Sequence, residues 1–153
     1  MKSIFLYIQI IFIVMLFCAC ESSLYHPHKK IYNIPTRINL DYEEISFKTH
    51  DDLELKGWLI KSTSKEKKGT ILHFHGNAQN RSTHFYQLSW LTAYGFDLII
   101  PDYRGYGDSE GSPNKKDIYQ DSLVFVRDSI NLHQHLKNNQ FILWGQSLGG
   151  NIA

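Results

Sequence analysis

Cysteine is almost absent from this chain: it has two among 153 residues, Cys18 and Cys20. The remainder therefore holds no disulfide framework and no cysteine-ligated metal site. A charge excess is missing too, because 16 Lys and Arg residues stand against 15 Asp and Glu. The chain therefore lacks the excess of positive charge that is typical of nucleic-acid-binding proteins, and no nucleic-acid partner is expected. With only four prolines, and 42% hydrophobic residues, the chain is neither disordered nor collagen-like, and one globular domain is expected.

Long hydrophobic runs are confined to the first twenty residues. From Ile4 to Phe17 only Gln9 is polar, Lys2 precedes this run, and small residues follow it. Such a pattern is typical of a secretory signal. Residues 16–20, Leu-Phe-Cys-Ala-Cys, resemble a bacterial lipobox, which implies that Cys20 is lipidated; an ordinary signal peptide or an uncleaved anchor is the alternative. Export or membrane attachment follows in each case, and we expect a chain attached to the membrane of a bacterium.

The rest of the chain divides by composition. Residues 21–40 contain Pro27 and Pro35 and show no clear periodicity, which suits an extended linker. We therefore expect a leader over residues 1–20, a linker over residues 21–40 and part of one domain over residues 41–153.

The domain opens with alternating sequence. Residues 42–47 and 53–60 alternate between apolar and polar side chains, and residues 49–52 between them have turn chemistry. This arrangement predicts an antiparallel hairpin. The lysine-rich stretch 62–68 that follows predicts a solvated loop.

Three short, continuous apolar runs come next, at residues 70–74, 97–100 and 140–144. Residues 82–94, between the first two runs, are expected to be helical. Strands that are apolar on both faces and alternate with helices predict a parallel sheet covered on both sides. The fold class is therefore α/β, with an N-terminal β-hairpin followed by parallel strands and with helices on both faces.

A second helix is expected between the last two runs. Ser112 is a candidate N-cap, with Pro113 at the first helical position. Core-facing residues then recur at helical spacing: Ile118, Ser122, Phe125, Val126 and Ile130.

The third apolar run ends in a G-x-S-x-G pentapeptide at residues 145–149. Its position between a buried strand and a helix is the context that a nucleophile elbow requires. Its glycines would let strand and helix approach closely, and Ser147 would be forced into a strained, exposed conformation. The helix N-terminus behind it would favour a developing oxyanion. Ser147 is therefore the candidate nucleophile.

A second motif follows the first parallel strand and reads His-Phe-His-Gly-Asn-Ala over residues 73–78. Acyl transfer needs two backbone N–H donors that converge on the developing oxyanion. One belongs to the residue after the nucleophile, here Leu148, and the other to the loop after this strand. Gly76 would let that loop bend inward, and Asn77 is the candidate second donor.

A third motif, residues 101–111, follows the second parallel strand. Its glycines, Gly105, Gly107 and Gly111, are spaced two and four residues apart, which matches neither a P-loop nor a dinucleotide fingerprint. We therefore expect a structural loop that flanks an active-site cleft, and we expect no cofactor and no metal.

These motifs together resemble the α/β-hydrolase superfamily, in particular its small exported or membrane-associated members similar to serine aminopeptidases and lysophospholipase-type esterases. The resemblance rests on HGNA at residues 75–78, DYRGYGDS at residues 102–109 and GQSLGG at residues 145–150. It implies a serine hydrolase of small-molecule esters, thioesters or amides. Implied roles are nucleophile for Ser147, oxyanion donors for Asn77 and Leu148, and structural polar residues for Asp102 and Arg104.

The triad of this family runs Ser, then acid, then His along the chain. The six residues after Ser147 include no acid and no histidine. Upstream, His75 is expected to hold the oxyanion loop, and His73 to be a hydrogen-bonded core residue. We therefore expect an incomplete fold, truncated after the elbow, with an uncovered edge at residues 140–144 and no appreciable activity of this chain alone.

Two functions remain open. The chain is either the N-terminal fragment of an exported serine hydrolase, or a non-catalytic truncated remnant that acts as a membrane-attached binding or structural protein. In a third, less favoured interpretation, the Ser147 pentapeptide is only a tight strand-to-helix turn in an unrelated binding fold.

Overall fold

The computed structural model describes residues 24–136 and 140–153. The expected leader and Cys20 lie outside the described residues. Within those two ranges, no helix is both long and apolar enough to cross a bilayer.

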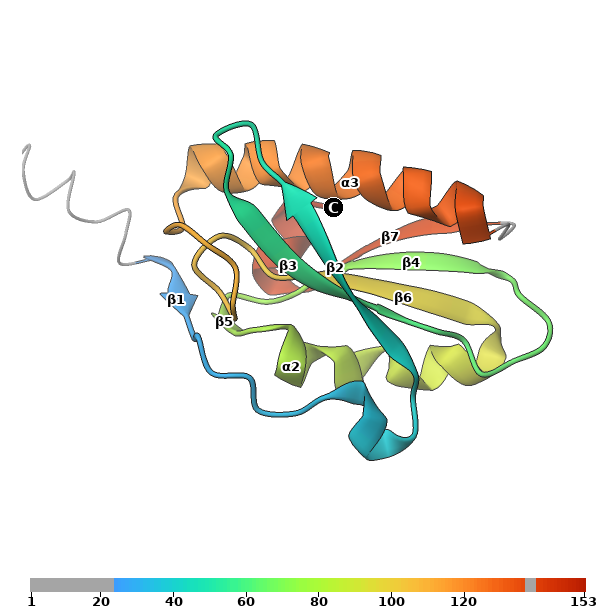
Figure 1. Cartoon of the computed structure of the whole chain (residues 1–153). Helices are drawn as coiled ribbons and strands as arrows, with labels where there is room; N and C mark the ends of the chain where they lie inside the picture. Colours follow the sequence, from blue (N-terminus) through green and yellow to red (C-terminus); the bar gives the residue numbers. More distant parts are fainter. Residues whose placement is uncertain (1–23, 137–139) are drawn as a thin grey trace, which may run out of the picture.

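A five-stranded mixed sheet forms the centre of the molecule (Figure 1). Its strands, in spatial order, are β2 (Tyr42–Lys48), β3 (Glu54–Ile60), β6 (Phe96–Pro101), β4 (Gly69–Phe74) and β7 (Phe141–Gly145). The β2–β3 pair is the predicted antiparallel hairpin, and β3 also pairs antiparallel with β6. Strand β4 pairs in parallel with β6 on one side and β7 on the other. The predicted α/β class and its order of elements are confirmed.

Each face of the sheet has its own hydrophobic cluster, because successive strand residues point to opposite faces. On β4, for example, Leu72 and Phe74 belong to the first cluster and Ile71 to the second. Helix α3 (Lys115–Leu136) covers the first cluster through Ile118 and Phe125. Figure 1 shows α3 on one side of the sheet and α2 on the other. Helices therefore cover both faces, as expected.

The second face is covered by three short helical segments instead of the one helix expected at residues 82–94. They are α2 (Arg81–His84), η3 (Phe85–Gln87) and η4 (Ser89–Tyr94). Side-chain hydroxyls explain the interruption: Ser89 Oγ donates to the Tyr86 carbonyl at 3.1 Å, and Thr92 Oγ1 donates to the Ser89 carbonyl at 2.7 Å. Local bonds of this kind compete with a regular helical ladder.

With Ser112 as its N-cap, the helix would begin at Pro113, but α3 begins two residues later, at Lys115. The prediction that Ser112 caps this helix is therefore wrong. Asn114 takes the capping role, because its Oδ1 accepts from the Asp117 N–H at 2.9 Å and its Nδ2 donates to the Asp117 carboxylate at 2.7 Å. Asparagine caps a helix as well as serine does. Ser112, which precedes Pro113, is exposed in the loop before the helix.

The part of the expected linker that the structure describes lies against the domain. Strand β1 (His26–Pro27) pairs in parallel with β5 (Ala78–Gln79), and η2 (Pro35–Ile38) follows. Tyr25 packs against the first hydrophobic cluster and Ile34 against the second. The segment is irregular, as its sequence indicates, but it is docked along its length.

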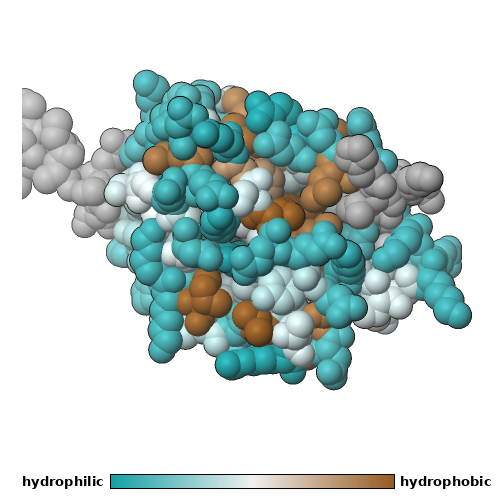
Figure 2. Space-filling model, in the orientation of Figure 1, coloured by the Kyte–Doolittle hydropathy of each residue, from teal (hydrophilic) through white to brown (hydrophobic). Residues whose placement is uncertain are grey.

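Hydrophilic residues cover most of the face seen in Figure 2, and hydrophobic residues show between them in patches. Two of the exposed hydrophobic residues, Leu143 and Trp144, belong to β7, one of the two edge strands of the described sheet; they are 41% and 45% exposed.

Candidate active site

Ser147 directly follows the turn at the carboxyl end of β7 and has a φ of 52°, a left-handed conformation that residues with a Cβ rarely adopt. Its side chain is exposed, as predicted for a nucleophile elbow. The Gln146 N–H just before it donates to the Phe74 carbonyl at 3.1 Å, which ties the elbow to the end of β4. Strain of this kind persists only where the surroundings hold it, and it concentrates at functional sites.

Two positions of the pentapeptide require glycine, because neighbouring backbone segments approach them too closely for a side chain. A Cβ on Gly145 would lie 2.2 Å from the Gly149 carbonyl oxygen, and one on Gly149 would lie 2.0 Å from the Phe74 carbonyl oxygen. Gly150 is different, because its nearest neighbour would be 3.6 Å away. The expected tight packing of strand and elbow is confirmed, although the segment after the elbow is a five-residue 3-10 helix, η5 (Ser147–Asn151).

An open pocket of about 500 Å³ lies at the elbow. Its lining includes Ser147, Leu148 and Asn77, so the structure brings together all three residues that the sequence placed in the site. The first N–H groups of a helix have no partner inside the helix, and Leu148 is the second residue of η5. The pocket is within the size range of small-molecule sites.

Two more of its lining residues, Leu24 and Tyr25, come from the segment that the sequence assigned to a linker. The signal that would have found them is their apolar pair beside Pro27, which does not suit a solvated linker. A second pocket, of about 380 Å³, shares Tyr25, Leu148 and Asn151 with the first. Ile118, Tyr119 and Ile152 make much of its wall apolar.

The Asn77 side chain is held by three hydrogen bonds. Its Nδ2 donates to the Leu24 carbonyl at 2.5 Å, and its Oδ1 accepts from the His26 N–H at 3.1 Å and from the Tyr106 hydroxyl at 2.7 Å. The expectation for Gly76 needs correction, because this glycine has no left-handed φ. A Cβ there would instead lie 3.2 Å from the His84 ring, so Gly76 provides space for that ring.

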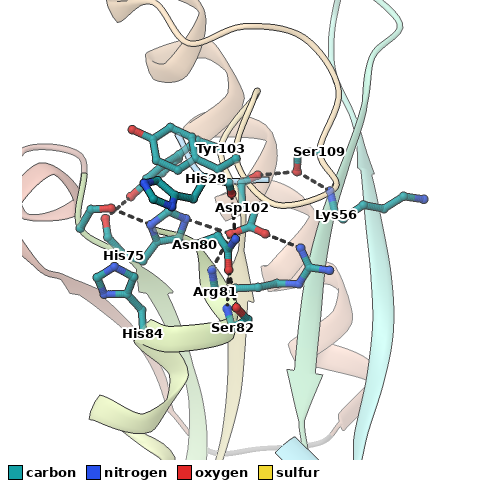
Figure 3. A network of polar contacts seen from close by, with 12 residues as sticks. His28, Lys56, His75, Asn80, Arg81, Ser82, His84, Asp102, Tyr103 and Ser109 are labelled. Carbon is teal, nitrogen blue, oxygen red and sulfur yellow. Dashed lines mark hydrogen bonds and ion pairs between the residues drawn. The ribbon is translucent and has the colours of Figure 1, made fainter. Parts of the chain in front are cut away.

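A buried polar network surrounds Asp102 (Figure 3). Asp102 accepts from the Arg81 N–H at 2.6 Å and forms an ion pair with the Arg81 guanidinium. Arg81 Nη1 also contacts Asp108 at 2.6 Å, and its guanidinium lies over the Trp58 ring. Asp102 is fully buried and far along the chain from Arg81, so it joins the loop after β6 to the start of α2.

His75 belongs to this network. Its Nε2 lies 3.1 Å from Asp102 Oδ1, without hydrogen-bond geometry, and its Nδ1 contacts the Gly76 carbonyl at 2.8 Å. The ring stacks on His84, whose two nitrogens contact Gln146 Oε1 at 3.0 Å and the Ala78 carbonyl at 2.8 Å. Among the described residues, no histidine lines either pocket. His75 therefore holds the loop and gives Ser147 no base.

His73 is a core residue, as expected, with 1% of its surface exposed. Burial lowers its pKa to about 3, so it is neutral at ordinary pH. The expected hydrogen bonding is not met at Nε2, which has no partner in the described part of the chain.

Arg104 has the structural role that the resemblance implied. It donates to Asp121 from Nε at 2.6 Å and from Nη2 at 2.8 Å, and it also binds Asp117 and Asp51. These bonds raise the pKa of Arg104, and the bonds to Asp121 have the largest effect. His50, Asp51 and Asp121 lie close enough together to suggest a metal site, but Arg104 already supplies the cation there.

Comparisons with known proteins agree with this geometry. A family model described as the alpha/beta hydrolase fold matches residues 69–153. YfhR of Salmonella typhi, named as an uncharacterized protein, is 34% identical over 98% of this chain and 51% of its own. The lysophosphatidylserine lipase ABHD12 of Danio rerio is 38% identical over 54% of this chain and 22% of its own.

A solved structure, the Pyrococcus furiosus esterase Pf2001, superposes with a TM-score of 0.68 and 22% identity, over 84% of this chain and 51% of that one. At this identity the likeness concerns the fold alone. The chain spans about half the length of the curated relatives from Salmonella typhi and Escherichia coli.

Proposed function

Because the chain belongs to the α/β-hydrolase family, we propose that it forms the N-terminal half of a serine hydrolase that cleaves a small-molecule ester, thioester or amide through an acyl-enzyme on Ser147. The observation that carries this proposal is the left-handed, exposed Ser147 at the end of a central-sheet strand, in one pocket with Asn77 and Leu148. A residue with a Cβ adopts this conformation at a cost, which suits a nucleophile that must stand clear of its neighbours.

In the proposed reaction, Ser147 Oγ attacks the substrate carbonyl carbon and forms a tetrahedral oxyanion. The backbone N–H groups of Asn77 and Leu148 stabilise that oxyanion. The bond to the leaving group then breaks, and a histidine that took the Oγ proton passes it to the leaving group. Water hydrolyses the acyl-enzyme by the same route in reverse. We assign the histidine and its acid to the half of the relatives that this chain does not span.

Residues 1–153 alone are therefore proposed to be inactive. Serine without a general base is a weak nucleophile, and the described residues place no histidine in the pocket. ABHD12 is named for an activity on a lysophospholipid. We propose an ester of this broad class as a candidate substrate.

The test uses two polypeptides: residues 1–153, and the longest natural polypeptide that contains them. We expect the longer one to hydrolyse p-nitrophenyl butyrate and to react with a fluorophosphonate, and Ser147→Ala to lose both properties. We expect the 153-residue chain to remain unlabelled. Rapid labelling of the short chain would contradict its inactivity, and Ser147-independent hydrolysis would contradict the mechanism. No reaction in either polypeptide would favour the non-catalytic remnant.

We also propose that the chain is exported and held at a membrane by a lipid on Cys20. The supporting feature is the apolar leader that ends in Cys18-Ala19-Cys20. A fatty-acid probe added to growing cells should label the wild-type chain and the Cys18→Ser control, and Cys20→Ser should lose the label. Label that survives Cys20→Ser would contradict the assignment.

A further inference from the structure

The segment from residue 24 to residue 30, here called the strap, bonds to two loops at once. It contacts the loop after β4 through Asn77 and Asn80: the Asn80 Nδ2 donates to the His28 and Lys30 carbonyls, both at 2.8 Å. On its other side it contacts the loop after β6. There the Gly107 N–H donates to the His28 carbonyl at 2.9 Å, and Lys29 Nζ donates to the Ser109 carbonyl at 2.7 Å.

The strap is also part of the pocket. Leu24 and Tyr25 line it together with Ser147, while His26–Pro27 runs parallel to Ala78–Gln79, the residues just after Asn77. These contacts join positions about fifty residues apart in the sequence. A segment with this number of partners is a component of the site, not a passive connection.

The Asn77 side chain is bound both by the strap and by the loop after β6. Two of its three side-chain bonds go to the strap backbone and the third comes from Tyr106. Tyr106 is itself fixed, since it is fully buried and its ring packs edge-on against Tyr103 with centroids 5.6 Å apart. Burial raises the pKa of Tyr106 to about 12, so its hydroxyl keeps its proton and remains a donor.

We propose that the strap and Tyr106 position Asn77 for oxyanion stabilisation, which makes Tyr106 a positioning residue and the strap backbone a wall of the substrate pocket. This inference rests on the proposed function, because the Asn77 N–H faces a developing negative charge only in the proposed acyl-transfer reaction. An oxyanion donor acts through its fixed place, and displacement by about 1 Å can cost a large part of the rate. The side-chain bonds of Asn77 fix the residue whose backbone carries that donor.

The first experiment does not depend on activity. Hydrogen exchange followed by mass spectrometry is measured on residues 76–79 of the whole chain, in wild type, Tyr106→Phe and Asn77→Ala. Losing a hydrogen bond of ordinary strength should speed exchange there by about fivefold. Exchange in residues 54–60 of the same samples should not change. Tyr42→Phe is the matched control, because Tyr42 packs on Trp58 and lies far from Asn77 in the sheet order.

The second experiment measures kcat and KM for p-nitrophenyl butyrate in the longer natural polypeptide. Tyr106→Phe should lower kcat about tenfold and change KM less than about twofold, because an oxyanion donor acts on the transition state. Tyr42→Phe should change neither value.

The outcomes separate the two proposals. Faster exchange at residues 76–79 together with the loss of kcat supports both. Faster exchange in a polypeptide that never hydrolyses the ester supports the strap as a brace of this loop and overturns the proposed function. Unchanged exchange in both variants, or a Tyr106→Phe effect confined to KM, overturns the positioning role whatever the activity.

Discussion

Arg81 binds Asp102 through its backbone N–H at 2.6 Å and again through its guanidinium. Both residues are almost completely buried; Arg81 begins α2, just after the loop that follows β4, and Asp102 begins the loop that follows β6. The pair therefore fixes the spacing between the loop that carries Asn77 and the loop that carries Tyr106.

Arg81→Met should destabilise the chain strongly. It leaves the Asp102 carboxylate buried without its cation, and breaking a buried pair in this way costs about 3–5 kcal/mol. Arg127→Met is the control, because Arg127 is exposed and its ion pair with Asp128 is a surface one, worth at most about 1 kcal/mol. Urea unfolding of both variants measures the difference. Equal losses in the two would refute the importance of the buried pair.

Gly149→Ala should be destabilising while Gly150→Ala is tolerated. The new Cβ at residue 149 would lie 2.0 Å from the Phe74 carbonyl oxygen, whereas at residue 150 the nearest atom is 3.6 Å away. Overpacking of this kind costs about 1–3 kcal/mol. Thermal unfolding of the pair gives the comparison, and a Gly149→Ala variant as stable as Gly150→Ala would contradict the close approach.

Ser147→Gly should be more stable than Ser147→Ala. Both lose the hydroxyl, but only glycine adopts the φ of 52° without strain, and that conformation costs an L-residue roughly 1–2 kcal/mol. Part of this gain is offset by the greater freedom of glycine in the unfolded chain. We expect a net gain of about 0.5–1 kcal/mol in the free energy of unfolding. An alanine variant of equal or greater stability would argue against strain at the elbow.

The stability of the chain should depend on Asp51 in acid. Hydrogen bonds from Thr49 and Arg104 lower the pKa of Asp51 from 3.8 to about 2. Between these two pH values the unfolded state binds the proton more readily, so the stability that Asp51 contributes is present above pH 3.8 and is lost as the pH falls toward 2.

Asp51→Asn should therefore flatten the pH dependence of the free energy of unfolding in this window. Asp52→Asn serves as the control, since Asp52 is exposed beside Lys48 and is not a partner of Arg104. Parallel curves for wild type and Asp51→Asn between pH 2 and 4 would exclude the assigned role.

The 153-residue chain should self-associate through β7. This strand is an edge of the described sheet, and its residues Leu143 and Trp144, which point to opposite faces, are both exposed. An apolar edge is a template for pairing with another chain. Trp144→Lys should shift the chain toward monomer in sedimentation velocity, whereas Trp90→Lys, at an exposed helical position, should not. A monomeric wild-type chain would contradict the expectation.

Local sequence patterns were enough to predict much of this fold. The alternation in residues 42–47 and the apolar runs at residues 70–74, 97–100 and 140–144 predicted the strands within one or two residues, because burial on one or two faces leaves a direct mark on the sequence. The pentapeptide predicted the strained elbow for the same reason: only glycine fits at residues 145 and 149.

Some of the parts that sequence missed depend on partners far along the chain: the apolar pair Leu24 and Tyr25 indicates a docked segment, but not that it lines the pocket of Ser147. The cap of α3 is a local exception, because Asn114 bonds to Asp117 three residues later, and by residue type Asn114 and Ser112 are equally suitable caps. The docking of the strap arises from bonds to Asn80 and Gly107, whose positions are set by the whole sheet. Local periodicity carries no information about such contacts.

The internal position of β4, between β6 and β7, also has a consequence for synthesis on the ribosome. Both partners of this strand lie later in the chain: β6 ends at Pro101 and β7 at Gly145. At about 5–20 residues per second, β7 follows β4 by several seconds. During that interval one edge of the most buried strand has no neighbour, so the nascent chain is expected to need a chaperone until β7 emerges.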